Sequence, residues 1–374
     1  VKTFEEENPG IRVKWENWPY VEAYNKYITT VKGGSPPDCG YTYDHMLPEL
    51  VERGAIVPVE DYISEDLKKD YYEAVLERAR YKGELWALPA WYSTNLITYR
   101  KDILDKHNLK VPTTPEEALA LAKALHNPPE LYGASFPAGS TPNSPIRWFS
   151  TQLWGRGGEF LTKDGTKAVF NSKAGIEALE YLMALEPYYQ PGYLSHGEHE
   201  LARIYNSGKV AWMQWSMGGA VLSPKEDHPD WEFVSAYPST PQKVSLGIED
   251  HYVIFKTTPE RQEAAYKWLE FTQRPEYTEH SNIDMGFLPT KRSAAEYYMS
   301  TDFFKNHPER DNIEAYIGAA EYVKWHPFSP KWNEIGTELQ EAIQLALTGK
   351  LTAEEALNQA ASKANEILDD FYKQ

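Results

Sequence analysis

The chain has 374 residues, which is enough for two or three packed domains. Its 55 Asp and Glu outnumber its 38 Lys and Arg, and the formal net charge of −17 disfavours nucleic acids and anionic membranes as partners. The single cysteine, Cys39, excludes an internal disulfide and a cysteine-rich zinc site.

Helix-like and strand-like patterns alternate through most of the sequence and predict an α/β fold. Residues 11–15 alternate between apolar and polar side chains and predict a strand. Thr114 with Glu117, and Thr352 with Glu355, have the spacing of residues that begin a helix. The other predicted elements are, in chain order, helices over 20–31, 45–53, 115–125 and from Asn171 or Ser172 to about 185, strands within 231–237 and 245–255, and helices over 259–272, 331–347 and 352–371.

No segment has the composition of a linker or of a membrane-spanning helix. The extended segments 95–101 and 244–250 are the best boundary candidates, because both would be crossovers if two lobes share the chain discontinuously. The first residue is Val1 and no apolar signal segment follows it, so we expect a processed or trimmed start.

The motifs that mark common catalytic sites are absent from the sequence. Ser216 lacks the glycine two positions earlier that a nucleophile elbow needs, and the Gly-Lys pairs at 208–209 and 349–350 precede aliphatic residues where a phosphate loop needs Ser or Thr. The glycine-rich run 154–159 follows no convincing strand, which disfavours a dinucleotide site. We predict no catalytic residue and no cofactor. A carboxylate pair for glycoside hydrolysis stays open, because sequence spacing does not reveal how far apart two acids lie.

His196 and His199 form the most metal-like cluster in the sequence. We interpret segment 196–200 as a solvated helix start, because the helix dipole favours acidic residues in a first turn. The tyrosine pairs 71–72, 188–189 and 297–298 are interpreted as one packed ring beside one solvated ring, rather than as iron ligands. We therefore predict no metal site.

A series of short motifs runs almost from end to end of the chain in a fixed order. Together they resemble the extracellular solute-binding proteins of ABC importers, specifically the carbohydrate-binding group that is similar to maltose-binding protein. The most specific block is 81–89 with 96–104 and 111–117. The other matching segments are 4–13, 34–38, 47–62, 207–213, 263–271, 286–290 and 348–357.

This resemblance implies the periplasmic-binding-protein type II fold, in which two α/β lobes are joined by crossover strands around a ligand cleft. It divides the chain into an N-terminal lobe, 1–97 with 250–297, and a C-terminal lobe, 98–249 with 298–374. The family has a further strand and loop before its first helix, and we expect that segment upstream of Val1. The resemblance also implies a location at the periplasmic or extracellular face of the cell membrane, in some members through a lipid anchor. The expected partners are a carbohydrate ligand and the transmembrane subunits of an importer, and we expect a monomer.

A sugar-binding role suits the heavy aromatic content of 12 Trp, 26 Tyr and 13 Phe. A sugar ring presents apolar C–H faces and a fringe of hydroxyls, and Trp and Tyr offer both a flat face and a hydrogen-bonding edge. So many rings suit two or more sugar units better than one, and carboxylates would accept hydrogen bonds from the hydroxyls. The predicted ligand-binding residues are Tyr41, Tyr43, Asp44, Trp91, Tyr92, Ser93, Thr94, Asn95, Trp148, Trp154, Gln214, Trp215, Glu249, Asp250, Trp325 and Trp332.

The resemblance decides which of these residues we favour. Segment 91–95 comes directly before the first crossover, where the family usually contacts its ligand from a strand end. Trp148 and Trp154 bracket a further predicted helix in the C-terminal lobe; six residues apart, they cannot lie on one helix face, so we expect at least one of them to point away from the core. Trp215 is favoured over Trp212, because Trp212 occupies a position that is usually a buried methionine.

Two alternative functions remain beside a binding protein that closes on an oligosaccharide, and one alternative role remains for segment 249–251. A secreted carbohydrate-active enzyme would share the aromatic richness. The same binding fold could take an acidic sugar or a sugar phosphate, since guanidinium groups pair with carboxylate and phosphate; the candidates are Arg147, Arg156 and Arg292. Finally, segment 249–251 could form a buried hinge network rather than contact ligand.

Overall fold

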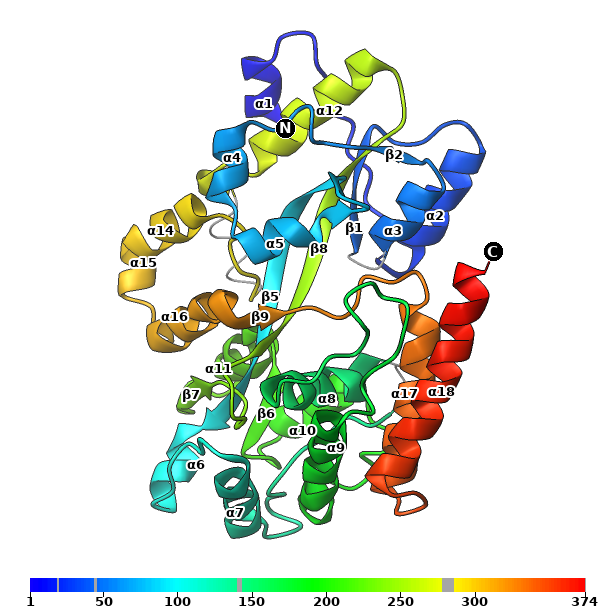
Figure 1. The fold of residues 1–374 in the computed structure, drawn as a ribbon. Coiled ribbons are helices and arrows are strands. Elements are labelled where there is room, and N and C mark those ends of the chain that lie inside the picture. Colours follow the sequence, from blue (N-terminus) through cyan, green and yellow to red (C-terminus); the bar gives the residue numbers. More distant parts are fainter. Residues whose placement is uncertain (19, 44–45, 140–142, 278–285, 374) are drawn as a thin grey trace. The chain divides into compact units, whose positions relative to one another are not determined.

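We analysed a computed structural model of the chain, which describes residues 1–374 except Pro19, 44–45, 140–142, 278–285 and Gln374. Its contacts divide the chain into two compact units (Figure 1). Unit 1 comprises Val1–Ser93 and Ile248–His307, and unit 2 comprises Thr94–Gly247 and Pro308–Gln374. The chain therefore passes between units after Ser93, Gly247 and His307, where the sequence analysis sets its lobe boundaries at 97, 249 and 297.

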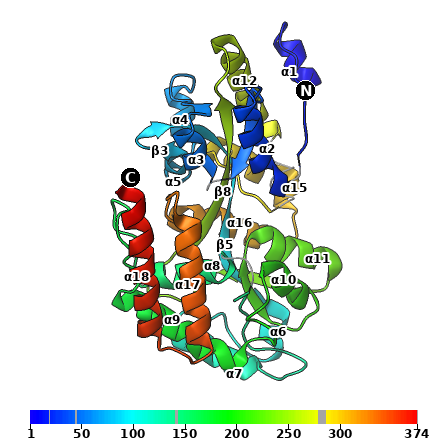
Figure 2. The same ribbon diagram turned by 90° about the vertical axis from the view of Figure 1, so that its right-hand side faces the viewer.

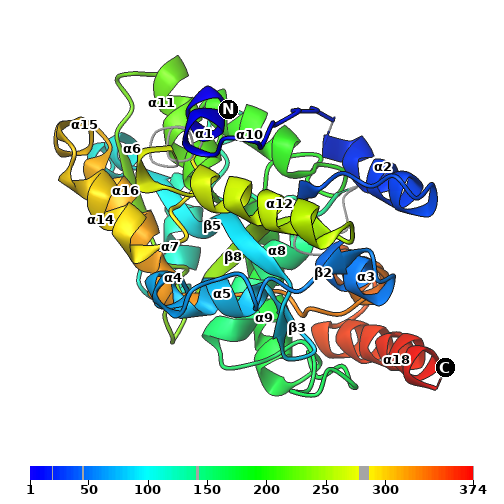
Figure 3. The same ribbon diagram turned by 90° about the horizontal axis from the view of Figure 1, so that it is seen from above.

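Unit 1 is built around the C-terminal part of strand β8 (Ser245–Phe255), which pairs antiparallel with β1 (Cys39–Tyr43) and β2 (Ile56–Val57). Helix α12 (Pro259–Thr272) packs against β1, and Figure 3 shows α12 and α5 on opposite sides of β5 (Ala87–Arg100). The other elements are α1 (Lys2–Glu7), α2 (Tyr20–Lys32), α3 (Leu47–Glu52), α4 (Glu65–Asp70), α5 (Glu73–Arg78), β3 (Arg80–Tyr81), β4 (Glu84–Leu85), α14 (Arg292–Ser300) and α15 (Asp302–Lys305).

Unit 2 is built around the C-terminal part of β5, with β6 (Trp212–Trp215) and β7 (Phe233–Ala236) antiparallel to it. The short β9 (Val323–Lys324) runs parallel to the first residues of β8. The other elements are α6 (Lys101–Lys106), α7 (Pro115–Leu125), α8 (Asn143–Gly155), α9 (Lys173–Leu185), η2 (Glu186–Tyr188), α10 (Glu198–Asn206), η3 (Gly218–Leu222), α11 (Ser223–Asp227), α16 (Arg310–Gly318), η4 (Ala319–Tyr322), α17 (Trp332–Leu347) and α18 (Ala353–Tyr372).

Helices α17 and α18 lie side by side and form an antiparallel hairpin (Figures 1 and 2). The hairpin turns at Gly349, whose φ of 68° is a conformation that glycine adopts without a steric penalty. Thr352 then begins α18: its hydroxyl accepts the Glu355 amide at 3.2 Å, and the Glu355 carboxylate accepts the Thr352 amide at 2.9 Å. The predicted capping box is confirmed.

Most of the predicted helices are also confirmed. Helix α7 begins with Thr114 accepting the Glu117 amide, α9 begins with Ser172 as its cap, and α12 spans the predicted residues. The predicted strand at 11–15 is wrong, because these residues join no ladder in the described part of the chain. The Val13 amide instead donates to the Glu5 carboxylate at 2.9 Å, so period-two alternation here reflects an extended segment without a partner strand.

None of the helices in the described residues combines the length and the apolarity needed to cross a membrane.

The α18 cap gives a first testable prediction. Thr352→Ala removes the hydroxyl that satisfies the Glu355 amide, so we expect a loss of about 1 kcal/mol in the free energy of unfolding. Thr337→Ala in α17 is the matched control, since Thr337 is an exposed mid-helix residue that bonds only the Asn333 carbonyl. Urea unfolding followed by circular dichroism measures both variants. An equal midpoint for T352A and wild type contradicts the capping contribution.

A second prediction concerns Cys39, the first residue of β1. Burial raises the pKa of this thiol to about 12, and the charge of Asp38 adds to the rise. At pH 8 only about one thiol in ten thousand is then ionised, and the thiolate is the reactive form. We expect the folded protein to react with a chromogenic disulfide reagent at least a hundredfold more slowly than the same protein in 6 M guanidinium. Reaction of the folded protein at the unfolded rate would show that the strand leaves Cys39 accessible.

Candidate functional site

A cluster of four side chains in unit 1, which we call the unit 1 ring cluster, consists of Tyr41, Trp91, Asp250 and Phe287. The Trp91 indole N–H donates a hydrogen bond to the Tyr41 hydroxyl at 2.7 Å, and the Tyr41 hydroxyl donates in turn to Asp250 Oδ2. The rings of Trp91 and Phe287 are stacked, with centroids 3.8 Å apart and planes at 21°. The cluster thus joins a half-buried aromatic surface to a hydrogen-bonded carboxylate that is itself only 3% exposed.

Strand register brings the polar half of this cluster together. Tyr41 in β1 lies opposite Tyr252 in β8, so Asp250, two residues before Tyr252, is its diagonal neighbour on the same face of the sheet. The rings of Tyr41 and Tyr252 meet edge to face at 6.0 Å. Phe287 reaches Trp91 through a separate backbone bridge, in which the Leu288 amide donates to the Tyr92 carbonyl at 2.7 Å.

The opposite face of β8 carries Glu249 and His251, because successive strand residues point to opposite faces. Both are fully buried, and Glu249 Oε1 lies 2.9 Å from His251 Nε2. Burial, with smaller contributions from Tyr72 and from the charge of Glu249, raises the pKa of the nearby Tyr92 well above its usual value, so this phenol stays neutral. Segment 249–251 therefore contains a buried polar pair on one face and a ring-cluster carboxylate on the other.

The residues after Trp91 are more enclosed than Trp91 itself. Tyr92, Ser93, Thr94 and Asn95 are all buried, and the Thr94 hydroxyl donates to the Tyr316 carbonyl at 3.2 Å. Trp91 is the half-exposed member of the segment.

Unit 2 has a second cluster where β6 ends beside the first turns of α8 and α10, and we call it the unit 2 ring cluster. Arg147 Nη1 lies 2.6 Å from Glu198 Oε2, and the half-exposed ring of Trp215 meets His199 at 5.9 Å. Gln214 is buried behind them, where its amide oxygen accepts from Thr151 at 3.1 Å and its amide nitrogen donates to the Arg147 carbonyl at 3.5 Å. Trp215 is the tryptophan of this cluster, and its ring lies beside the exposed imidazole of His199.

The expectation that Trp148 or Trp154 points away from the core is wrong, since both are buried. Trp148 packs against Phe136 and Trp212, while Trp154 packs against Phe160 and His326. Helix α8 is covered by β6 on one side and by α9 and α17 on others, so two faces of the helix are interior.

The remaining predicted residues have varied settings. Trp332 is buried against Phe160, and Trp325 lies beside Gly247, where a Cβ would come within 2.3 Å of its ring. Trp212 is buried, as expected for its position. Asp44 and the side chain of Tyr43 lie outside the described residues. Ligand contact by the predicted site residues stays a prediction.

Sequence reasoning missed Phe287 and Glu198 as cluster members. Phe287 belongs to a segment used only for the family resemblance, and no local pattern indicates its stacking on a ring almost two hundred residues earlier in the chain. The start of α10 at Glu198 agrees with the helix start predicted at 196–200, but Glu198 itself is only 15% exposed and pairs with Arg147. Within the described residues, no group of three or more His, Cys, Asp or Glu is arranged to hold a metal ion.

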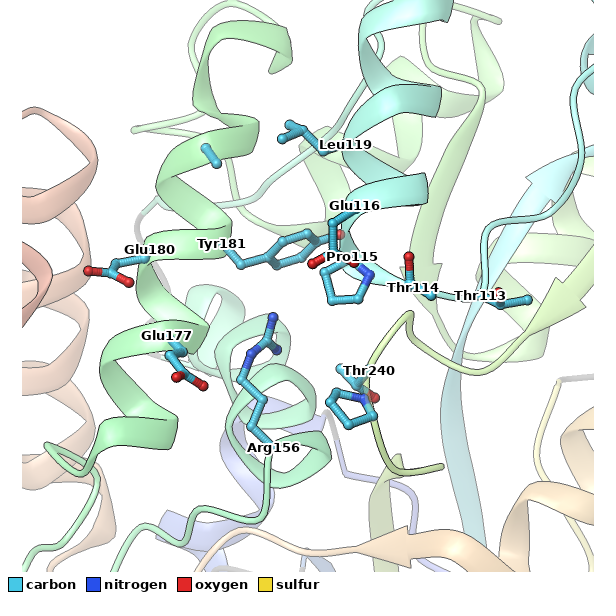
Figure 4. A pocket seen from close by; sticks show the side chains of 12 residues that line it. Thr113, Thr114, Pro115, Glu116, Leu119, Arg156, Glu177, Glu180, Tyr181 and Thr240 are labelled. Carbon is cyan, nitrogen blue, oxygen red and sulfur yellow. The ribbon is translucent and has the colours of Figure 1, made fainter.

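Unit 2 also contains a pocket of about 620 Å³ beside the start of α7, the middle of α9 and the end of α8 (Figure 4). Tyr181 is the aromatic residue among its described lining residues, and the Arg156 guanidinium lies 5.3 Å from the centre of that ring. Arg156 also donates to the side chain of Gln152 at 2.7 Å, and burial lowers its pKa. Glu116, Glu177 and Glu180 line the pocket as well, and none of the predicted ligand-binding residues that the structure describes does. The Tyr181 ring already contacts the Arg156 guanidinium and lies among three carboxylates, so it is poorly suited to stack on a sugar.

Comparison with known proteins places the chain in a family. Residues 1–312 match the family described as bacterial extracellular solute-binding protein. A putative binding protein of Brucella abortus is 26% identical over 98% of this chain and 88% of its own length. The maltotriose-binding protein of Pyrococcus abyssi is 22% identical over 90% of this chain and 70% of its own length.

Solved structures resemble the fold over its whole length. The cyclic alpha-maltosyl-1,6-maltose binding protein from Arthrobacter globiformis has a TM-score of 0.86 at 20% identity, and covers 99% of this chain and 94% of its own. The sugar-binding protein MalE from Xanthomonas citri has a TM-score of 0.83 at 20% identity, and covers 100% of this chain and 95% of its own. The predicted periplasmic-binding-protein type II fold is confirmed, and the chain belongs to the bacterial extracellular solute-binding protein family.

Proposed function

We propose that this protein binds a neutral carbohydrate, with an oligosaccharide as the leading candidate, and delivers it unchanged to the membrane subunits of an ABC importer. The observation that carries the proposal is the unit 1 ring cluster, where the half-exposed Trp91 lies beside the Tyr41–Asp250 hydrogen bond. An aromatic face next to a fixed carboxylate matches the apolar face and the hydroxyl fringe of a sugar. Trp215 offers a second ring in unit 2.

The arginines favour a neutral ligand over an acidic sugar or a sugar phosphate. Arg147 is paired with Glu198 at 2.6 Å, and the Arg292 guanidinium lies 4.9 Å from the centre of the Tyr72 ring. Arg156 lies in the separate acidic pocket. An anion would therefore compete with an existing carboxylate at Arg147 or enter a pocket lined by three glutamates.

Several relatives support the choice of a carbohydrate and of transport, while two others are sn-glycerol-3-phosphate-binding periplasmic proteins. One relative is a maltotriose-binding protein and another a mannitol-binding protein, and one structural neighbour was solved with cycloalternan. Another relative is described as a putative ABC transporter periplasmic-binding protein. The proposal includes a periplasmic or extracellular location, a monomeric state, and closure of the two lobes on the ligand as the family resemblance implies.

Binding without chemical change is also part of the proposal. Asp250 accepts a hydrogen bond from Tyr41, and Glu198 is paired with Arg147 at 2.6 Å, so each carboxylate is already engaged by a donor beside it. A glycosidase needs one carboxyl group that stays protonated to act as an acid. Each of these acids instead holds a neighbouring side chain in place.

A ligand screen tests the function. Differential scanning fluorimetry of the purified chain is run against neutral di- to tetrasaccharides, uronic-acid oligomers and sugar phosphates, followed by calorimetry and chromatographic recovery of each hit. We expect stabilisation by neutral oligosaccharides that are recovered intact, because a ligand of the native state raises apparent stability by mass action. Hits confined to the anionic compounds, or hydrolysis of the sugar, would contradict the proposal.

Alanine variants of the two half-exposed tryptophans test the site. We expect Trp91→Ala and Trp215→Ala each to raise the dissociation constant of the best neutral hit at least tenfold, because each removes a ring face. A tenfold rise corresponds to a loss of about 1.4 kcal/mol in binding free energy. Trp15→Ala is the matched control, since Trp15 is 70% exposed and lies outside both clusters. Arg156→Ala tests the separate pocket and should leave the affinity unchanged. Equal affinities for the W91A, W215A and W15A variants would move the binding site elsewhere.

A further inference from the structure

We infer that Tyr41 acts as a positioning residue for Trp91, and that Trp91 meets its ligand with a ring face and not with its indole N–H. Phe287 is the second positioning residue, because it supports the opposite face of the same indole. The ligand class that fits is a sugar unit presenting an unsubstituted apolar pyranose face. This inference rests on the proposed carbohydrate function and specifies how one residue of that site works.

The first step concerns the indole edge. Trp91 has a single polar hydrogen, on Nε1, and the Tyr41 hydroxyl oxygen already accepts it at 2.7 Å. A sugar hydroxyl could take this hydrogen only by displacing Tyr41. That exchange would leave the phenol without the donor it has now, so the net gain would be small.

The second step concerns Tyr41. A phenol has one hydrogen to donate, and Tyr41 gives it to Asp250 Oδ2. The donors therefore point in one direction along a relay, from Trp91 to Tyr41 to Asp250. Because a charged acceptor at the end strengthens the bonds before it, the relay holds the phenol and the indole in one relative orientation.

The third step concerns the ring faces. Phe287 stacks on one face of Trp91 at 3.8 Å, with the planes 21° apart, and Trp91 makes no second ring contact with the described residues. The indole is thus fixed by a hydrogen bond at its edge and by a ring on one side. Because Trp91 keeps part of its surface exposed, the face away from Phe287 is the one that we infer a pyranose covers.

The relay can be tested without any ligand, in protein labelled with ¹⁵N on tryptophan. Loss of one indole signal in Trp91→Phe identifies the Trp91 N–H. In Tyr41→Phe we expect this signal to shift and to exchange faster with water than in wild type, while the other indole signals stay in place. Asp250→Asn, which keeps an acceptor for the Tyr41 hydroxyl, should shift it less. An unmoved Trp91 signal in Y41F would overturn the inference.

A double-mutant cycle on affinity separates positioning from direct contact. With maltotriose as the first probe, and otherwise the best neutral hit of the screen, we expect Y41F and W91F each to weaken binding about three- to tenfold. The double variant should be no more than about twofold weaker than W91F alone, because Tyr41 acts through the indole N–H that W91F lacks. If the loss of affinity in the double variant equals the product of the two single losses, Tyr41 contacts the sugar itself.

Phe287 has its own matched pair of variants. Phe287→Leu should weaken binding about three- to tenfold, whereas Phe287→Tyr, which keeps the ring, should bind as wild type does. Melting temperatures of all variants identify any that fail to fold. If no carbohydrate perturbs any indole signal, the proposed function fails, while the ligand-free comparison of wild type and Y41F still decides whether the relay exists.

Discussion

The antiparallel pairing of β1 with β8 is the constraint on which the candidate site of unit 1 depends. With Tyr41 opposite Tyr252, the alternation of strand side chains sends Asp250 to the face of Tyr41 and sends Glu249 and His251 to the other face. A shift of one residue would exchange these two faces. It would move a buried ionisable pair toward the rings and take the carboxylate away from Tyr41.

The two faces of β8 each carry a carboxylate, but the neighbours of these carboxylates differ. On one face, the fully buried Glu249 and His251 lie 2.9 Å apart. On the other face, Asp250 is buried as well, but Tyr41 joins it to the half-buried Trp91. Adjacent residues in the chain can therefore have a structural role and a proposed binding role at the same time.

In unit 2 the burial of helix α8 limits which tryptophan rings are available to a ligand. Since both Trp148 and Trp154 are interior, the ring available beside Gln214 is the half-exposed Trp215, at the end of β6. Arg147 and Glu198 neutralise each other next to it at 2.6 Å. The pairing explains why an arginine in this segment does not by itself indicate an anionic ligand.

The sequence alone determined the fold class, the family and most of the helices of this protein. Helix caps such as Thr114 and Thr352 are local, because the hydrogen bonds that they make reach only three residues along the chain. The tertiary structure decided the rest: that residues 11–15 have no partner strand, that Trp154 is interior, and that Phe287 stacks on Trp91. Strand pairing and ring stacking join residues far apart in the chain, and the periodicity of a single segment contains no information about its partner.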